Sequence, residues 1–252
     1  MIISVVTPVH SEGTAFLGEA YASLATQSLP DGWSWEWCIQ EDGPDVHAAA
    51  HLPSGDRRIR ISASRQGGPH VARTMAFARS TGRYVKNLDS DDQLTPGALE
   101  RDISVLEAHP DVGWTTSRVL DLLEDGSTRS FEHSDPETGL LPQGSAYDFW
   151  VHHRRPQVHP ATLCVRRPLL ALLGGWMALP ASGDTGLLLG LDALTPGWFI
   201  GDVGLIYRKH GGQITAHPDH RSGPEWEARM SLIQQRAEAL RAWAGRAPGE
   251  RP

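Results

Sequence analysis

"YVKNLDSDDQLTPG", residues 84–97, is the stretch that decides how this chain is expected to fold. A strand-like apolar run ends here in three carboxylates within four positions, those of Asp89, Asp91 and Asp92. Carboxylates this close together repel one another and raise one another's pKa unless a cation lies among them. Oxygen ligands of this kind suit Mg²⁺ or Mn²⁺. Taken alone, the cluster predicts either a divalent-metal site or a solvated turn with a helix-capping aspartate.

The first half of the chain alternates between strand and helix patterns. β-Branched and alternating apolar runs predict strands at 2–9, 34–40, 58–62 and 83–89. Helical spacing predicts a helix at 15–27, another at 70–80 with Val71, Met75 and Ala78 as its apolar positions, and a third opened by Pro96. This β/α alternation predicts a mainly parallel sheet.

Polar clusters follow three of these predicted strands, at residues 7–10, 41–43 and 89–92. Because ligands of open α/β sheets bind at the carboxyl ends of the strands, we expect the three clusters to meet at one edge.

The second half is less regular. The pattern predicts a strand, a turn and a return strand over 112–133, a loop over 132–146 and a strand leading into a short helix over 160–176. It then predicts a helix at 183–194, a strand at 197–210 and an amphipathic helix at 224–244. The tail after Gly245 is expected to be disordered.

Composition excludes several function classes. The 252 residues suit one large domain or a domain with an appended segment. The net charge of -7 without a long basic run argues against a general nucleic-acid binder. No apolar run approaches the ~18 residues of a membrane span, so we expect a cytoplasmic protein without an integral membrane segment. Cys38 and Cys164 lie in apolar stretches and are expected to be buried thiols.

The motifs of the first half occur in a specific order. "TPVHSEGTAFLGEAYASLATQSLP" at 7–30, "EDG" at 41–43 and "RQGGPHVARTMAFARSTGRYVKNLDSDDQLTPGALE" at 65–100 resemble the N-terminal half of family 2 glycosyltransferases. The resemblance is strong over 2–110 and weaker to about 216. It implies an α/β GT-A fold, a Rossmann-like mixed sheet flanked by helices, with a less regular acceptor side and a C-terminal helix.

This resemblance divides one GT-A domain into parts with different roles. Residues 1–110 would bind the nucleotide sugar, and residues 111–216 would bind the acceptor and carry out catalysis. Residues 217–252 would form a C-terminal helix and tail, and that helix offers a contact for a homodimer.

The resemblance also implies a donor site. Thr7, Pro8 and Val9 would contact the nucleotide base, and Glu12 would lie near the ribose. Asp42 would accept a hydrogen bond from uracil. Asp89, Ser90 and Asp91 would lie at the ribose, the diphosphate and the metal. Where the family has a DDGS-like turn, this chain has Glu41 to Pro44, so the preference for uracil is left less fixed.

Two arginines have alternative roles. Planar guanidinium groups suit phosphate, so Arg65 and Arg73 would reach the base or the diphosphate. Otherwise Arg65 is a solvated surface residue and Arg73 forms a salt bridge on its helix.

The segment 166–191, "RRPLLALLGGWMALPASGDTGLLLGL", resembles the part of the family that supplies the catalytic base. It places Asp184 at the base position, with Gly183 where the family usually has glutamate. A carboxylate there would deprotonate the acceptor hydroxyl, and the alternative for Asp184 is helix N-capping.

Three further residues follow from the same resemblance. "YRKHGGQIT" at 207–215 places His210 where a third metal ligand, in addition to Asp91, or a diphosphate contact can occur. Trp176 is placed near the acceptor, with core packing as the alternative, and His159 would line the acceptor pocket.

The sequence therefore predicts an inverting glycosyltransferase that depends on Mn²⁺ or Mg²⁺ and moves a sugar from a nucleotide donor, expected to be a UDP-sugar, to a hydroxyl of a small molecule or envelope precursor. The lack of a QxxRW motif disfavours a processive synthase. One alternative is a catalytically weak nucleotide-sugar sensor. A sugar nucleotidyltransferase is less consistent, because the first strand is not followed by a basic glycine-rich loop.

Overall fold

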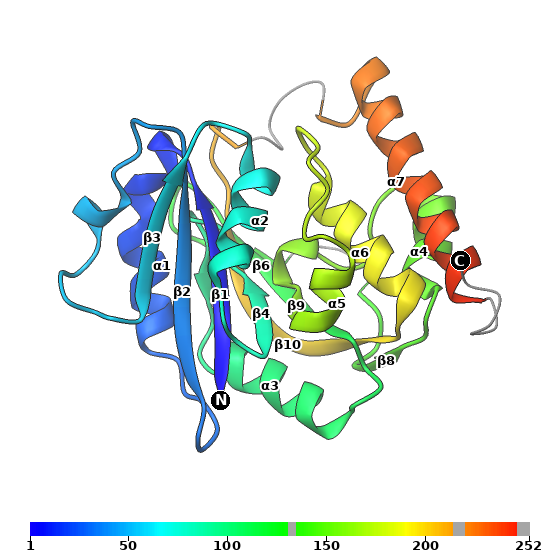
Figure 1. Cartoon of the computed structure of the whole chain (residues 1–252), viewed down its shortest axis with the longest axis horizontal. Coiled ribbons are helices and arrows are strands. Elements are labelled where there is room, and N and C mark those ends of the chain that lie inside the picture. Colours follow the sequence, from blue (N-terminus) through cyan, green and yellow to red (C-terminus); the bar gives the residue numbers. More distant parts are fainter. Residues whose placement is uncertain (131–134, 214–219, 246–252) are drawn as a thin grey trace.

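Strand β1 (Ile2–Val9) is paired on both sides, as its run of buried β-branched residues predicts. It belongs to a mixed sheet in which the strand order is β3-β2-β1-β4-β9-β6-β10-β5, with β7 beside β6 and β8 beside β10. Figure 1 shows this sheet in the computed structural model, which describes residues 1–130, 135–213 and 220–245. The expected disordered tail lies outside the described residues.

The sheet is parallel in its first part and contains antiparallel strands further along, namely β9, β5, β7 and β8. The first four strands in the order are parallel to one another, and β6 is parallel to β10, but β9 is antiparallel to both β4 and β6. The remaining strands are β2 (Ser34–Asp42), β3 (Ile59–Ser64), β4 (Tyr84–Asn87), β5 (Gln93–Leu94), β6 (Trp114–Leu122), β7 (Thr128–Ser130), β8 (Gly139–Leu141), β9 (Cys164–Arg166) and β10 (Gly197–Arg208). The predicted mixed α/β fold is thus confirmed, and the sheet is mainly parallel only in its first half.

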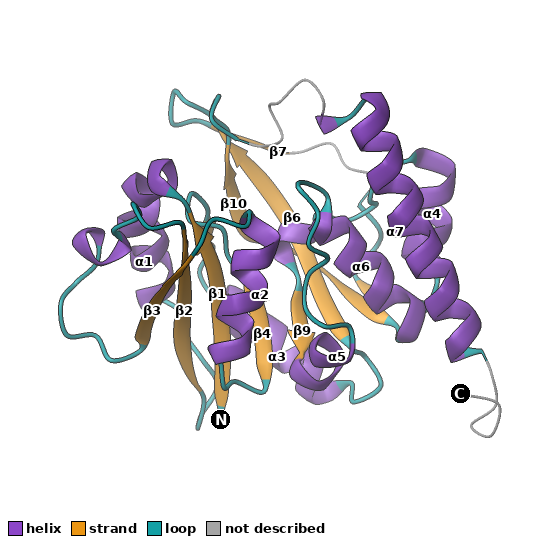
Figure 2. Cartoon of the chain, turned by 45° about the horizontal axis from the view of Figure 1, so that its top comes forward, coloured by secondary structure: helices purple, strands orange, loops and turns teal. Residues whose placement is uncertain are grey.

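Helices cover both faces of the sheet (Figure 2). One face is covered by α1 (Leu17–Ala25) and α3 (Ala98–Ala108), whose apolar residues share a core cluster with Trp37 and Ile39 of β2. The other face is covered by α2 (Pro69–Arg79), α5 (Arg167–Leu172) and α6 (Gly183–Leu194).

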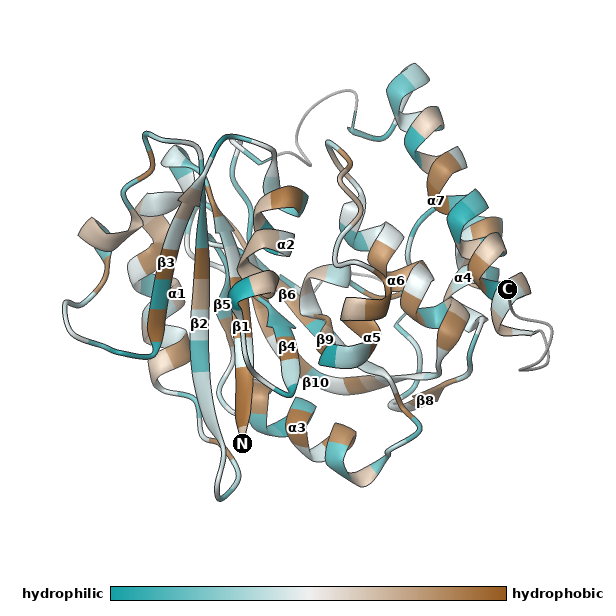
Figure 3. Cartoon of the chain, viewed as in Figure 1, coloured by the Kyte–Doolittle hydropathy of each residue, from teal (hydrophilic) through white to brown (hydrophobic). Residues whose placement is uncertain are grey.

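Two helices form an outer layer on α6. Both α4 (Ser145–His153) and α7 (Gly223–Ala244) contact it, so α6 is enclosed and Leu187, Leu188 and Leu189 are fully buried. Burial of one such side chain contributes about 1.5–3 kcal/mol to folding. Figure 3 shows α7 alternating between hydrophobic and hydrophilic colouring, and its buried residues Met230, Ile233 and Ala237 pack in the same cluster as α6. No helix among the described residues has both the length and the apolar character needed to cross a bilayer.

Short 3-10 helices complete the chain; they span Ser11–Phe16, Ala48–His51 and Pro160–Thr162. The first joins β1 to α1, so the polypeptide turns sharply at the edge of the sheet where the polar clusters were expected.

Some expectations for individual segments were wrong. Met75 is 43% exposed, and the buried face of α2 carries Ala72, Arg73, Ala76 and Phe77 instead of the expected apolar positions. The predicted loop over 132–146 contains β8 and the start of α4. The two-residue strand β5 was not expected, because it is too short to show a period.

Candidate active site

An open cavity of about 1460 Å³ lies at the carboxyl ends of β1 and β4, the edge where the sequence predicts a site. It is lined by several of the predicted residues, namely Pro8, Arg73, Asp89, Ser90, Asp91, His159, Asp184 and His210. Its lining comes from both halves of the chain, since α4, α6, the end of β10 and α7 contribute beside the first strands. Both halves of the chain therefore contribute to one cavity.

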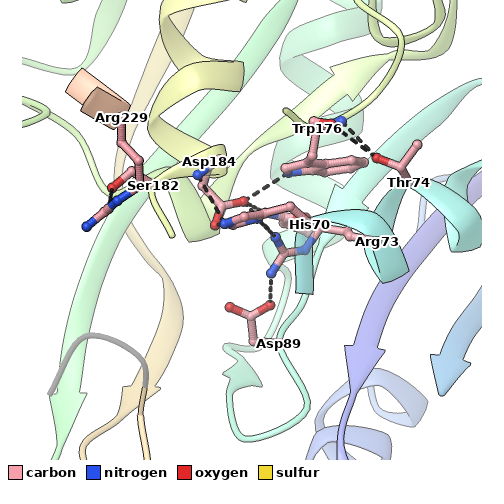
Figure 4. A network of polar contacts seen from close by, with 10 residues as sticks. His70, Arg73, Thr74, Asp89, Trp176, Ser182, Asp184 and Arg229 are labelled. Carbon is pink, nitrogen blue, oxygen red and sulfur yellow. Dashed lines mark hydrogen bonds and ion pairs between the residues drawn. The ribbon is translucent and has the colours of Figure 1, made fainter. Parts of the chain in front are cut away.

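Arg73 of α2 connects two carboxylates that line this cavity, those of Asp89 and Asp184 (Figure 4). Its Nη1 lies 2.8 Å from Asp184 Oδ1, and its Nη2 pairs with Asp89. The arginine side chain is 2% exposed, whereas the two carboxylates are about a quarter exposed. The planar guanidinium thereby fixes the end of β4 relative to the start of α6.

Asp184 stands in the first turn of α6, and its hydrogen bonds converge on one oxygen. Besides Arg73, the indole N–H of Trp176 donates to Oδ1 at 2.9 Å and the amide of Asn87 donates to it at 3.4 Å. Burial by itself would raise the pKa of Asp184, but the charge of Arg73 and these hydrogen bonds outweigh it and lower the pKa. The carboxylate is therefore ionised, and every hydrogen bond it accepts among the described residues ends on Oδ1, which leaves Oδ2 to accept a proton.

The carboxylates that follow β4 have different surroundings. Burial raises the pKa of Asp89 despite its pairing with Arg73, and the charges of Asp184 and Asp91 act in the same direction. Asp92 is fully buried, and its Oδ1 accepts a hydrogen bond of 3.0 Å from the backbone N–H of Arg208, which ties this turn to β10. Burial and the neighbouring Asp91 raise the pKa of Asp92 well above its usual value.

The predicted metal ligands lie side by side. His210 Nε2 is 3.0 Å from Asp91 Oδ2, and both residues line the cavity. A carboxylate and an imidazole are chemically suitable for Mn²⁺, and an ion bound by so few protein groups completes its coordination with water and substrate phosphate. The described residues contain no cluster of three or more His, Cys, Asp or Glu placed to hold a metal. The residues present therefore fit a substrate-completed metal site and not a closed protein cage.

Some of the residues predicted to contact the nucleotide base form hydrogen bonds with other parts of the protein instead. Thr7 is fully buried, and its hydroxyl donates to Leu88 O at 2.6 Å and accepts from the indole of Trp37. Both carboxylate oxygens of Asp42 accept backbone N–H groups, from Gly67 at 2.6 Å and from Gly68 at 3.0 Å. These contacts hold the turn before α2.

Six predicted residues lie outside the cavity lining, and two of them are Thr7 and Asp42, described above. Val9 is buried beside it, and Arg65 is exposed in the bend after β3. A Cβ placed on Gly212 would lie 3.0 Å from Glu12 Oε2, so Glu12 faces the His210 segment. Trp176 is 5% exposed, and its indole is directed to Asp184.

The sequence reading missed His70, Asn87 and the pair Ser182–Arg229. His70 lies in the first turn of α2, three residues before Arg73, which is the helical spacing that places both on one face. Arg229 of α7 is 3% exposed, and its Nη1 donates to Ser182 Oγ at 2.7 Å. Ser182 has a left-handed backbone with φ of 63°, directly before α6. The spacing of His70 and Arg73 was the available signal, whereas nothing local connects Arg229 to Ser182.

Comparison with solved structures places the fold in a class. The chain superimposes on residues 1–349 of S. aureus TarS, solved in complex with UDP-GlcNAc, with a TM-score of 0.72, covering 97% of this chain and 71% of that one at 17% identity. The same fragment solved with UDP gives a TM-score of 0.68 at 15% identity, covering 97% of this chain and 70% of that one. The fold is the GT-A fold of glycosyltransferases.

The sequence comparisons then identify the family. Residues 4–170 match the family model "Glycosyl transferase family 2", and the chain belongs to this family. The O-antigen biosynthesis protein RfbC of Myxococcus xanthus is 33% identical over 181 residues, which are 69% of this chain and 13% of that protein. The uncharacterized glycosyltransferase MJ1057 of Methanocaldococcus jannaschii is 26% identical over 64% of this chain and 55% of its own length. The chain thus spans from about an eighth to about half of these relatives.

Proposed function

We propose that the chain transfers a sugar from a nucleotide sugar, with UDP as the nucleotide, to a hydroxyl of an acceptor, with inversion at the anomeric carbon. Membership in the family supports sugar transfer, and the bound UDP and UDP-GlcNAc of the TarS structures support a uridine nucleotide. The observation that carries the proposal is the ionised Asp184 at the cavity wall, linked through Arg73 to Asp89.

Asp184 acts as the base in this proposal. A sugar hydroxyl is a poor nucleophile at neutral pH, so its proton is accepted by Asp184 while the new C–O bond forms. The bond from the anomeric carbon to the nucleotide diphosphate breaks on the opposite face, and the electron pair leaves with the diphosphate. Because only one displacement occurs, the configuration is inverted. Arg73 and Trp176 keep Oδ1 in place so that Oδ2 faces the acceptor.

Asp91 and His210 would hold the divalent ion, Mn²⁺ or Mg²⁺, together with the donor's diphosphate. When bound, such an ion neutralises the charge that develops on the leaving group. Asp89 and Ser90 line the same wall and would contact the ribose and the diphosphate.

The proposed division of labour follows the chain. Residues 1–110 would bind the donor, 111–216 the acceptor, with His159 on its wall, and 217–252 would add the C-terminal helix. The homodimer contact proposed for that helix would use its outward side, because Met230 and Ile233 are already buried within the chain. The cytoplasmic location and the envelope-precursor acceptor remain predictions.

Donor turnover tests the proposal directly. Wild-type protein with UDP-sugars and Mn²⁺ is expected to release UDP slowly without an acceptor and faster with one. Asp184→Asn, which keeps the size of the side chain, is expected to lower this rate by about 10²- to 10⁴-fold while the donor still raises the melting temperature. Donor binding without release of UDP in the wild type would support the sensor alternative, and equal rates in both proteins would refute the role of Asp184.

A further inference from the structure

Gly183 and His70 occupy adjacent positions that only one side chain can fill. A Cβ placed on Gly183 would lie 2.5 Å from Cγ of His70 and 2.8 Å from its Nδ1, which is closer than real Cβ contacts come. His70 is 4% exposed, so the imidazole has little room to move away. The glycine at position 183, where the family usually has glutamate, is therefore matched by a histidine that fills the space.

The imidazole also binds the start of α6. The backbone N–H of Gly183 donates to His70 Nε2 at 3.0 Å. The first N–H groups of a helix have no partner within the helix, so this bond satisfies one of them in a buried place. The catalytic base Asp184 is the next residue along the chain.

These contacts define the protonation of the ring. Burial lowers the pKa of His70 to about 4, so the ring is neutral at pH 7 and only one of its nitrogens can accept a hydrogen bond. Two donors face the ring, the Gly183 N–H at Nε2 and a guanidinium N–H of Arg73 at Nδ1; because the Gly183 contact is the shorter, we assign Nε2 as the acceptor and the proton to Nδ1. Nδ1 lies 3.8 Å from Asp184 Oδ2 and 3.3 Å from Arg73 Nη1. At 3.8 Å no hydrogen bond forms, but the Nδ1–H dipole still favours the ionised carboxylate.

We propose that His70 is a positioning residue for Asp184: its Nε2 anchors the first turn of α6 through Gly183, and its Nδ1–H faces the oxygen that accepts the proton. Gly183 is then the residue that makes room for this imidazole and not a sign of lost catalysis. The inference rests on the proposed function of Asp184 as the base.

The tautomer is measured on the full chain without any substrate. In protein labelled with ¹⁵N-histidine at pH 7, the ring signals that disappear in His70→Gln belong to His70. We expect a protonated Nδ1 and an unprotonated Nε2. A ring protonated on Nε2, or on both nitrogens, would overturn the proposal.

A double-mutant cycle tests the link between the two positions. Because a 1 Å displacement of a reacting group can cost about 10²-fold, we expect His70→Ala to lower kcat for UDP release by about 10- to 10²-fold, with the donor KM changed less than about threefold. Gly183→Ala is expected to have a similar effect in the wild type and little further effect in His70→Ala. Additive effects, or a wild-type kcat in His70→Ala, would refute the proposal.

Two variants separate positioning from general stability. In His70→Gln, the amide oxygen can accept the Gly183 N–H, so this variant is expected to keep more of kcat than His70→Ala. The side chain in His70→Asn is too short to reach this N–H, so kcat is expected to be as low as in His70→Ala. His109, which stacks on Trp198 away from the cavity, serves as the control, and His109→Gln should leave kcat unchanged. If wild-type protein turns over no nucleotide sugar, the proposed function fails. The link between His70 and Gly183 is then still tested by the tautomer and by the same double-mutant cycle measured with the free energy of unfolding in place of kcat.

Discussion

Arg73 and Asp184, 111 positions apart in the sequence, form an ion pair of 2.8 Å at the wall of the cavity. The pair joins the first half of the chain, which holds the diagnostic motifs, to the second half, which holds the proposed base. The buried guanidinium thus links the two halves at the cavity wall, in addition to the pairing of β4 with β9, and this gives the first prediction.

Replacing Arg73 by glutamine should leave Asp89 and Asp184 without their shared positive charge. Breaking a buried ion pair costs about 3–5 kcal/mol, so a loss of this order in the free energy of unfolding is expected at pH 7. Urea unfolding at pH 7 and at pH 5 measures it. The deficit should shrink at pH 5, because the unpaired carboxyls then take up protons; equal deficits at both pH values would contradict the argument.

Metal binding should depend on Asp91 without depending on the overall charge of the cavity rim. In Asp91→Asn, the increase in melting temperature that Mn²⁺ adds to that of UDP is expected to disappear, since the carboxylate ligand is lost. Asp125→Asn is a matched control, because Asp125 lines the same cavity but is exposed in a turn. A similar loss in both variants would indicate a general charge effect instead of a ligand.

Asp192 should make the protein less stable as the pH rises from about 4 to about 6. It lies in α6 and accepts N–H groups of Gly144, Ala146 and Tyr147 at the start of α4, yet burial raises its pKa to about 6 from 3.8. The folded state then binds more protons than the unfolded state in this interval, so the free energy of unfolding falls as the pH rises, by up to about 3 kcal/mol.

The comparison with Asp192→Asn isolates this contribution. Chemical unfolding of both proteins across pH 4 to 7 should show a smaller decline in the variant. An identical pH dependence would mean that Asp192 has an ordinary pKa.

Lys86 should be a strong determinant of stability. Its side chain is 1% exposed, and its Nζ lies 2.7 Å from Asp102 Oδ2 and 2.7 Å from Thr162 O. Lys86→Met leaves a buried carboxylate unpaired, and a loss of about 3–5 kcal/mol is expected. Arg118→Met, which removes one partner of the more exposed pair with Asp135, should cost less than about 1 kcal/mol. Thermal or urea unfolding compares them, and similar losses would argue against the importance of burial.

The sequence predicted the parts of the fold that depend on local patterns. Strands 2–9, 34–40 and 83–89 and the acidic turn after the last of them show in the sequence as apolar runs that stop at polar residues. Helix α2 was oriented wrongly because its buried face carries Arg73, and a charged residue is assigned to the solvent side unless its two partners are known.

For the site, sequence resemblance located residues on the cavity wall, but their mutual contacts depend on tertiary structure. The three-residue spacing of His70 and Arg73 indicates a shared helix face, but the close fit of the imidazole against Gly183 is seen only in the structure. The strand β9, antiparallel to both its neighbours, brings the second half beside β4, and no short stretch of sequence encodes that pairing.

The hydrogen bond from Arg229 to Ser182 lets the last helix, α7, hold the start of α6, which bears Asp184. The family match ends at residue 170. Helix α6, which bears the proposed base, and helix α7, which holds the residue before α6, therefore both lie outside the matched residues. A protein shortened to the matched residues would lack both helices and the Arg229–Ser182 hydrogen bond, so it would retain the family's motifs while the residue before α6 lost its partner from the last helix.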